Sequence, residues 1–170
     1  MGQSSYSDVA TTGAIALSTK TIVYAAIMGA LYFVLVIAFA PLSFYVLQFR
    51  VANVLKALAV CSPAFAFGYA IGDVFANMAS PFGPLDWAVM PLFDVAGALT
   101  AYALRRHLPV AIVAQSVIIA LGVAVFPLGL GAGLPMGLTF CYVFASTLAI
   151  IAGGSVILLP AYRAVVERLR

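Results

Sequence analysis

The sequence predicts an all-α integral membrane protein with six transmembrane helices and both termini on the cytoplasmic side. Composition supports the membrane class, because 65% of the 170 residues are hydrophobic and only 8% are charged, against about 25% charged residues in soluble domains. The mean hydropathy of +1.18 agrees. The length suits one domain, residues 1–170, in which residues 1–19 form a polar N-terminal segment.

Proline, glycine and charged residues divide the chain into six apolar segments. A spanning helix needs about 20 mostly apolar residues, and clusters of Pro and Gly end helices. The predicted spans are residues 21–40, 45–61, 64–79, 85–104, 109–126 and 136–159. Pro41 ends the first, Ser62-Pro63 separates the second from the third, and the loops 80–84 and 127–135 follow the third and fifth. The run Arg105-Arg106-His107 ends the fourth.

Basic residues set the orientation. With both termini cytoplasmic, the residues at or near the inner side are Lys20, Lys56, Arg105, Arg106, Arg163, Arg168 and Arg170. Only Arg50 then lies outside, which is the asymmetry that the positive-inside rule describes. The second segment carries several polar residues and therefore suits a helix packed inside the bundle better than one that faces lipid.

Three aspartates, Asp73, Asp86 and Asp94, lie close together in this apolar chain. A carboxylate at mid-membrane costs about 2.5–3.5 kcal/mol even on the lenient insertion scale, so such groups face a bundle interior, a cavity or an aqueous end. The topology places the polar residues Gln48, Arg50, Asn53, Asn77 and Asp86 at the outer ends of spans two to four. Asp73 lies about one turn deeper than Asn77, and Asp94 lies roughly 12 Å deeper than Asp86. The sequence thus predicts one outward-facing polar pocket.

Several polar or aromatic residues of this region also have a structural interpretation. Asp86 could cap the fourth helix, and Asp73 and Asp94 could pair with Arg50 or relay protons. Arg50 could be an interfacial residue that extends its charge to water. Asn77 could hydrogen-bond a broken helix end. Trp87 suits an interfacial aromatic belt as well as a stacking platform.

Other chemistry is not expected. Cys61, Cys141 and His107 lack the spacing of a metal or disulfide site, no nucleophile–base pairing suggests an enzyme, and no cofactor is expected. The scattered basic residues do not suggest nucleic-acid binding. In the first span Ala26 and Ala30 have the small-xxx-small spacing that lets two helices approach closely.

Two segments carry a family resemblance. Residues 47–51, Leu-Gln-Phe-Arg-Val, follow the loop 41–44, and residues 72–77 lead into the run 80–86, Ser-Pro-Phe-Gly-Pro-Leu-Asp. Both resemble the QueT-type substrate-binding subunits (S components) of energy-coupling factor (ECF) vitamin transporters, mainly across residues 41–106. The resemblance implies a six-helix bundle in the cell membrane that binds a queuosine precursor, a 7-deazaguanine base.

The resemblance also implies partners and a binding site. Ala26 and Ala30 would contact the transmembrane coupling subunit, and two cytoplasmic ATPase subunits would power release. This chain has no phosphate-binding Gly-x-x-x-x-Gly-Lys-Ser/Thr segment, so any nucleotide hydrolysis must occur in a partner. The candidate substrate contacts are Gln48, Arg50, Asn53, Asp73, Asn77, Asp86, Trp87 and Asp94. A carboxylate can accept the N1–H and amino donors of a guanine-like edge together, and a second suits a cationic aminomethyl arm.

The chain departs from the family pattern at several positions. Ala52-Asn53 stands where Ser-Glu is usual, and Asp73 stands where a small residue is usual, so an acid is lost at one pocket position and gained at another. Gly153-Gly154-Ser155 replaces a Gly-Glu pair, and Gln115 lies near a usual Asn. The alternatives are an S component for another vitamin or small molecule, and a self-sufficient proton-coupled carrier that uses Asp73 and Asp94.

Overall fold

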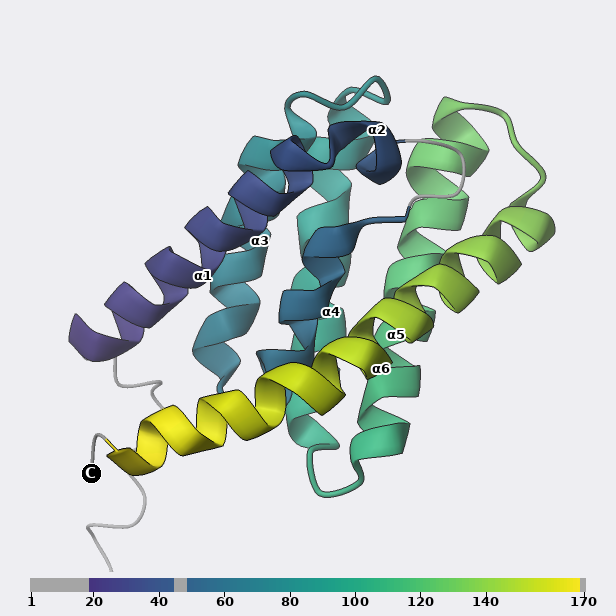
Figure 1. The fold of residues 1–170 in the computed structure, drawn as a ribbon. Coiled ribbons are helices and arrows are strands. Elements are labelled where there is room, and N and C mark those ends of the chain that lie inside the picture. The colour runs from purple at the N-terminus through teal and green to yellow at the C-terminus, as the bar shows by residue number, and fades with distance from the viewer. Residues whose placement is uncertain (1–18, 45–48, 169–170) are drawn as a thin grey trace, which may run out of the picture.

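The regular structure of the protein is helical throughout the residues that this computed structural model describes, 19–44 and 49–168 (Figure 1). The helices are α1 (Thr19–Ala38), α2 (Ala40–Ser43), the 3₁₀ helix η1 (Val51–Val60), α3 (Pro63–Asn77), the π-helical turn η2 (Leu85–Val89), α4 (Met90–Ala103), α5 (Leu108–Val125), the π-helical turn η3 (Phe126–Gly131) and α6 (Met136–Arg168). The all-helical prediction is confirmed. Gln48 lies outside the described residues.

Six main segments alternate in direction through the bundle. In Figure 1, α1, α3 and α5 run toward one end, whereas η1, α4 and α6 run back. The first residues of α1 and the last residues of α6 therefore lie at the same end. The loop between α3 and η2 lies at the opposite end, which is called the distal end below.

Three helices are long and apolar enough to cross a membrane within the described ranges: Thr21–Ala38, Leu108–Gly131 and Met136–Arg168. The second predicted span is only 10 residues long as η1, and α3 has 15 residues. The sixth predicted span covers residues 136–159, and the helix α6 continues past it, through Pro160 to Arg168, with 33 residues in all. At about 1.5 Å per residue, α6 is about 50 Å long, which exceeds a hydrocarbon core of about 30 Å.

The short helix η1 is enclosed by its neighbours. Seven of its ten residues are buried, and it packs against α1, α3, α4 and α6. Tyr69 on α3 donates a hydrogen bond of 2.7 Å to the carbonyl of Leu55, which ties the backbone of η1 to α3. The prediction that this polar segment is a packed helix rather than a lipid-facing one is confirmed.

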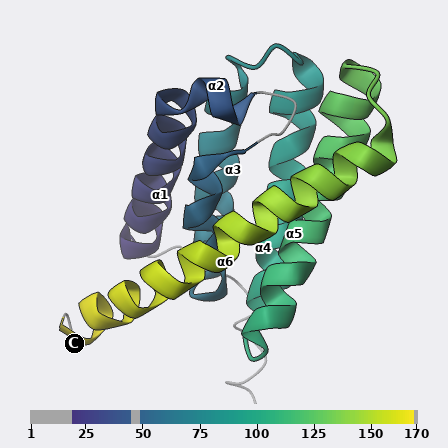
Figure 2. The same ribbon diagram turned by 45° about the vertical axis from the view of Figure 1, so that its right-hand side comes forward.

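Glycines let helices touch through their backbones at two places. A Cβ on Gly68 or Gly72 of α3 would lie 2.4 Å from the carbonyl oxygen of Ala25 or Gly29 of α1. A Cβ on Gly154 of α6 would lie 2.5 Å from the carbonyl oxygen of Val54 in η1. These contacts fix α1 against α3 and α6 against η1, while α6 runs diagonally across the bundle in both views (Figures 1 and 2).

Candidate functional site

The winding of η1 aligns the polar residues of the second segment. A 3₁₀ helix has three residues per turn, so side chains three apart lie above one another. Asn53 and Lys56 therefore share one edge of η1, and Arg50 begins the same edge, because its carbonyl accepts the Asn53 N–H at 2.9 Å. All three side chains are buried. One edge of a short helix thus carries two cations and an amide into the bundle.

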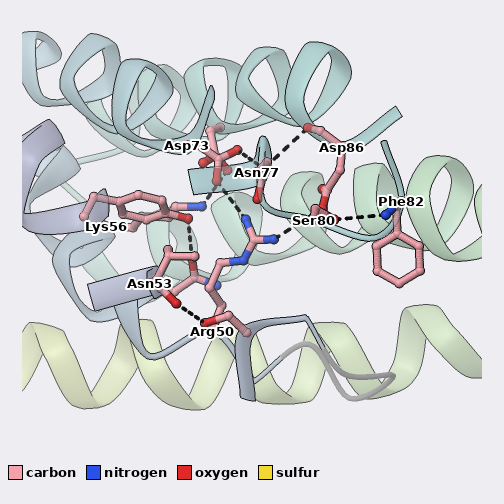
Figure 3. Close-up of polar contacts among 12 residues, drawn as sticks. Arg50, Asn53, Lys56, Asp73, Asn77, Ser80, Phe82 and Asp86 are labelled. Atoms are coloured by element: carbon pink, nitrogen blue, oxygen red, sulfur yellow. Dashed lines mark hydrogen bonds and ion pairs between the residues drawn. The ribbon is translucent and has the colours of Figure 1, made fainter. Parts of the chain in front are cut away.

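Arg50 joins η1 to α3 and η2 at the distal end (Figure 3). Its Nη1 donates to Asp73 Oδ1 at 2.7 Å, and its Nη2 lies 3.9 Å from Asp86 Oδ2. Asn77 donates through Nδ2 to Asp73 Oδ2 at 2.9 Å and to the backbone carbonyl of Asp86 at 3.4 Å. Asp73, Asn77 and Asp86 are fully buried. The four side chains are called the distal cluster below.

Lys56 and Asp94 form a second buried ion pair, here the inner pair. Lys56 Nζ lies 2.5 Å from Asp94 Oδ1 and 5.2 Å from the centre of the Tyr32 ring, a cation–π arrangement. Tyr32 also donates to Asn53 Oδ1 at 3.4 Å. A cavity of about 10 Å³ lies between the inner pair, Arg50 and Thr147, which is room for about one water molecule. The site is therefore closed, and a molecule larger than water can enter only if its walls move apart.

A wide helical turn carries Asp86. Residues 85–89 form a π-helical turn, and Pro91 follows at the start of α4. Proline has no N–H for the preceding turn and its ring crowds the carbonyl four residues earlier, so it loosens the helix there. Asp86 is buried within this turn, whereas the neighbouring Trp87 is 38% exposed.

Several buried polar atoms have no hydrogen-bond partner among the described residues. They are Asn77 Oδ1, Asp86 Oδ1, Asp86 Oδ2, Asp94 Oδ2, Gln115 Nε2 and Thr147 Oγ1. The four that belong to the distal cluster and the inner pair are all acceptors. Buried polar groups are normally hydrogen-bonded, so these atoms are the ones available to a ligand.

The structure brings together most of the residues that the sequence predicts for the site. Arg50, Asn53, Asp73, Asn77, Asp86 and Asp94 all lie in the distal cluster or beside the inner pair. Trp87 does not join them, and Gln48 is not described. Asp86 lies in the first turn of η2, where an acid suits the helix dipole, but it makes no capping hydrogen bond, because neither carboxylate oxygen has a hydrogen-bond partner among the described residues. Asn77 does bond a carbonyl at the loosened helix start, as its structural interpretation expects.

Pairing corrects two further expectations. Asp73 pairs with Arg50, but Asp94 pairs with Lys56 instead. Lys56 is consequently a buried residue of the site. It does not contribute to the excess of basic residues in the loops on the inner side, on which the positive-inside rule is based. Arg50 is 4% exposed, so it is not an interfacial residue.

Sequence reasoning missed Lys56, Tyr32 and Thr147 as residues of the site. The spacing of three from Arg50 through Asn53 to Lys56 was a usable signal, but it indicates a shared face only for a 3₁₀ helix. Tyr32 and Thr147 come from distant segments, and no local pattern marks either of them. Among the described residues, no group of three or more His, Cys, Asp or Glu is arranged to hold a metal ion.

Ala26 and Ala30 lie away from this site. Both are exposed, while their neighbours Ala25 and Gly29 make the backbone contacts with α3. A groove of about 1010 Å³ lies along α1 and α3, and Ala26, Ala30, Phe67 and Phe75 are among the mostly apolar residues that line it. The first helix thus has one small-residue face for α3 and another that opens to the surroundings.

Comparison with known proteins identifies the class of the chain. The family model described as QueT transporter matches residues 22–163. No curated protein and no solved structure matches. The matched region includes the distal cluster, the inner pair and the three long apolar helices, which fit a multi-pass membrane protein. A transporter family is not a class of enzymes. The chain therefore belongs to the QueT transporter family.

Proposed function

We propose that this chain is the substrate-binding subunit of an ECF-type importer, and that its cargo is a queuosine precursor, a 7-deazaguanine base. The observation that carries the proposal is the distal cluster. It assembles Arg50 from the Leu-Gln-Phe-Arg-Val segment with Asn77 and Asp86 from the Asn-to-Asp run, the two segments that resemble QueT-type S components. Its unpaired acceptors suit the N1–H and amino donors of a guanine-like edge.

The proposed topology has six crossings with both termini in the cytoplasm. Its support is the alternation of the six segments, together with Lys20, Arg105, Arg163 and Arg168, whose positions in the chain fall at the same end of the bundle. The distal end then faces outward, and the substrate enters there. In this arrangement the short helix η1 is not exposed to the full thickness of lipid, because α1, α3, α4 and α6 pack around it.

The proposed partners are a transmembrane coupling subunit and two ATPase subunits. The chain has no phosphate-binding loop motif, so the energy of nucleotide hydrolysis has to come from another chain. The apolar groove that contains Ala26 and Ala30 is the proposed contact for the coupling subunit, since small residues there let a second helix approach closely.

The test of cargo is equilibrium binding of a 7-deazaguanine to the purified protein in detergent, with submicromolar affinity expected. Asp86→Ala and Asp73→Ala should each weaken binding at least tenfold, about 1.4 kcal/mol, and Asp94→Asn should weaken it less, because Asp94 is already paired with Lys56. No binding of any such base would remove the cargo proposal. A silent Asp86→Ala with a damaging Asp94→Asn would place the substrate at the inner pair.

Reconstitution separates the importer from a self-sufficient carrier. Liposomes that contain this chain alone should show no uptake, whereas co-expression with a coupling subunit and ATPases should give ATP-dependent uptake. Proton-driven uptake by the chain alone would favour the carrier.

A further inference from the structure

We infer that the cavity beside the inner pair is a binding site for one ordered water molecule, which accepts a hydrogen bond from Thr147 and donates one to Asp94. This water joins α6 to the ion pair that η1 and α4 form. The inference concerns the protein without cargo and does not depend on which cargo the chain carries.

The hydroxyl of Thr147 differs from the other hydroxyls of α5 and α6. Every other Ser or Thr of these two helices donates its hydroxyl to a carbonyl of the same chain segment, at 2.7–3.0 Å: Ser116, Thr139, Ser146 and Ser155. Thr147 is 1% exposed, and its Oγ1 has no hydrogen-bond partner among the described residues. A helical Thr usually bonds the carbonyl one turn earlier, here that of Val143, and this carbonyl already accepts from Ser146 at 3.0 Å. The Thr147 hydroxyl is therefore available to a group in the cavity.

Asp94 supplies a matching acceptor on the same cavity. Its Oδ1 accepts from Lys56 at 2.5 Å, whereas its Oδ2 is buried without a partner in the described part of the chain. Asp94 and Thr147 both line the cavity of about 10 Å³. A carboxylate oxygen only accepts, and a hydroxyl can donate. Since the two side chains do not bond each other, a small group between them satisfies both.

The size and the charge of the cavity fit water. Its volume of about 10 Å³ has room for about one water molecule. Arg50 and Lys56 also line it, and their positive charges disfavour a metal cation, while the Asp94 carboxylate disfavours an anion. A buried water normally makes about three hydrogen bonds. Here it accepts from Thr147 and from the Lys56 ammonium, which has three N–H donors, and it donates to Asp94 Oδ2.

The water adds a polar link to a contact that otherwise depends on close packing. Gly154 of α6 lies against the backbone carbonyl of Val54 in η1, and Thr147 lies about two turns earlier on α6. A hydrogen-bonded bridge from Thr147 to Asp94 connects α6 to α4 and, through Lys56, to η1. Removal of the Thr147 hydroxyl should therefore be felt only while the inner pair is present.

Direct observation is the first arm of the test. A crystal structure of the wild type, at a resolution that shows ordered waters, should contain one oxygen-sized peak about 2.5–3.0 Å from both Asp94 Oδ2 and Thr147 Oγ1. The same peak should be missing from Thr147→Val, which keeps the shape of the side chain and loses the hydroxyl. A cavity without a peak in the wild type would overturn the inference. A peak with about six oxygen ligands would also overturn it, because that geometry indicates a cation.

Thermal unfolding in two backgrounds is the second arm. Thr147→Val should lower the unfolding temperature of the wild type by at least about 2 °C, because it leaves buried groups without a hydrogen-bond partner. In the Lys56→Met/Asp94→Leu background the same change should not lower it, since no carboxylate remains for the water to bridge. An equal loss in both backgrounds would overturn the inference.

Thr139→Val is the matched control for this comparison. Thr139 is a buried residue of the same helix, and its hydroxyl donates to the carbonyl of Pro135 at 2.9 Å. Its replacement should shift the unfolding temperature equally in the two backgrounds. A dependence on the inner pair as large as that of Thr147→Val would contradict the proposed bridge, because the effect would then not be specific to the cavity.

Discussion

At the residue scale, the inner pair shows how a charged side chain is tolerated in an apolar bundle. Lys56 and Asp94 are each 1% exposed, and isolated charges of that kind would cost several kilocalories per mole each. The short contact between them and the Tyr32 ring offset this cost. Because the pair lies where η1 meets α4, its loss should affect the whole bundle.

The inner pair can be tested by a double-mutant cycle. Lys56→Met or Asp94→Leu alone leaves an uncompensated buried charge, so each should destabilise the protein by about 3–5 kcal/mol. The double variant replaces both charges with apolar side chains and should recover most of that loss. Thermal unfolding in detergent, followed by a thiol-reactive dye or by loss of the monodisperse peak, measures the four stabilities. Additive losses would mean that the two residues do not stabilise each other.

At the scale of elements, the contact between α6 and η1 depends on a single missing side chain. Gly154 and Gly153 are neighbours in α6, but only Gly154 meets η1, with the Val54 carbonyl 2.5 Å from an added Cβ. Nothing lies within 4 Å of a Cβ on Gly153. The same substitution at adjacent positions therefore separates packing from helix propensity.

Gly154→Ala should lower the unfolding temperature and weaken ligand binding, since pushing α6 from η1 displaces the edge that carries Arg50 and Lys56. Gly153→Ala should be neutral or stabilising, because Ala is favoured over Gly in a helix by about 0.5–1 kcal/mol. Melting curves and binding titrations of the two variants provide the comparison. Equal effects from both would contradict the backbone contact.

The exposed face of α1 gives a prediction about the partner. Ala26→Leu and Ala30→Leu should abolish transport by the assembled importer but leave ligand binding by this chain unchanged, because these residues line the groove and not the site. Val34→Leu, at a position of α1 that is 57% exposed and outside the groove lining, is the matched control. Uptake assays and binding titrations are needed together. Transport at wild-type rates with both leucines in place would contradict the proposed contact.

The elements also show what the sequence can predict. Apolar runs and breakers located all six segments, and the spacing of Asn77 and Asp86 around the Ser-Pro-Phe-Gly-Pro loop predicted that α3 and α4 meet at the distal cluster. The sequence could not predict that η1 is a 3₁₀ helix instead of an α-helix. Over ten residues, a mixture of apolar and polar side chains is compatible with both kinds of helix. The sequence did not indicate that α6 continues past residue 159, because a proline such as Pro160 usually stops a helix, whereas here the helix continues past it. Lys56 was placed in the second span and counted near the inner side, and the sequence did not indicate its pairing with Asp94.

At the scale of the whole molecule, the proposed topology predicts which loops face which side. The loop between α4 and α5 contains Arg106, and the loop between η3 and α6 contains Ala132; the two loops lie at opposite ends of the bundle. Each position can be replaced by cysteine, as Arg106→Cys or Ala132→Cys. In a background with Cys61→Ser and Cys141→Ser, a membrane-impermeant thiol reagent added to intact cells should label Ala132→Cys only. It should label Arg106→Cys after the cells are permeabilised. Labelling of Arg106→Cys in intact cells would reverse the orientation.

The 3₁₀ winding of η1 makes the electrostatics of the site depend on helix pitch. Six residues complete two turns of a 3₁₀ helix, at three residues per turn, so Lys56 lies directly above Arg50. In an α-helix the same six residues fall about 120° short of two turns. Rewinding η1 would therefore rotate one cation out of register with the other and leave an aspartate of the site without its counter-charge. The alignment of the two buried cations therefore depends on the 3₁₀ pitch of η1.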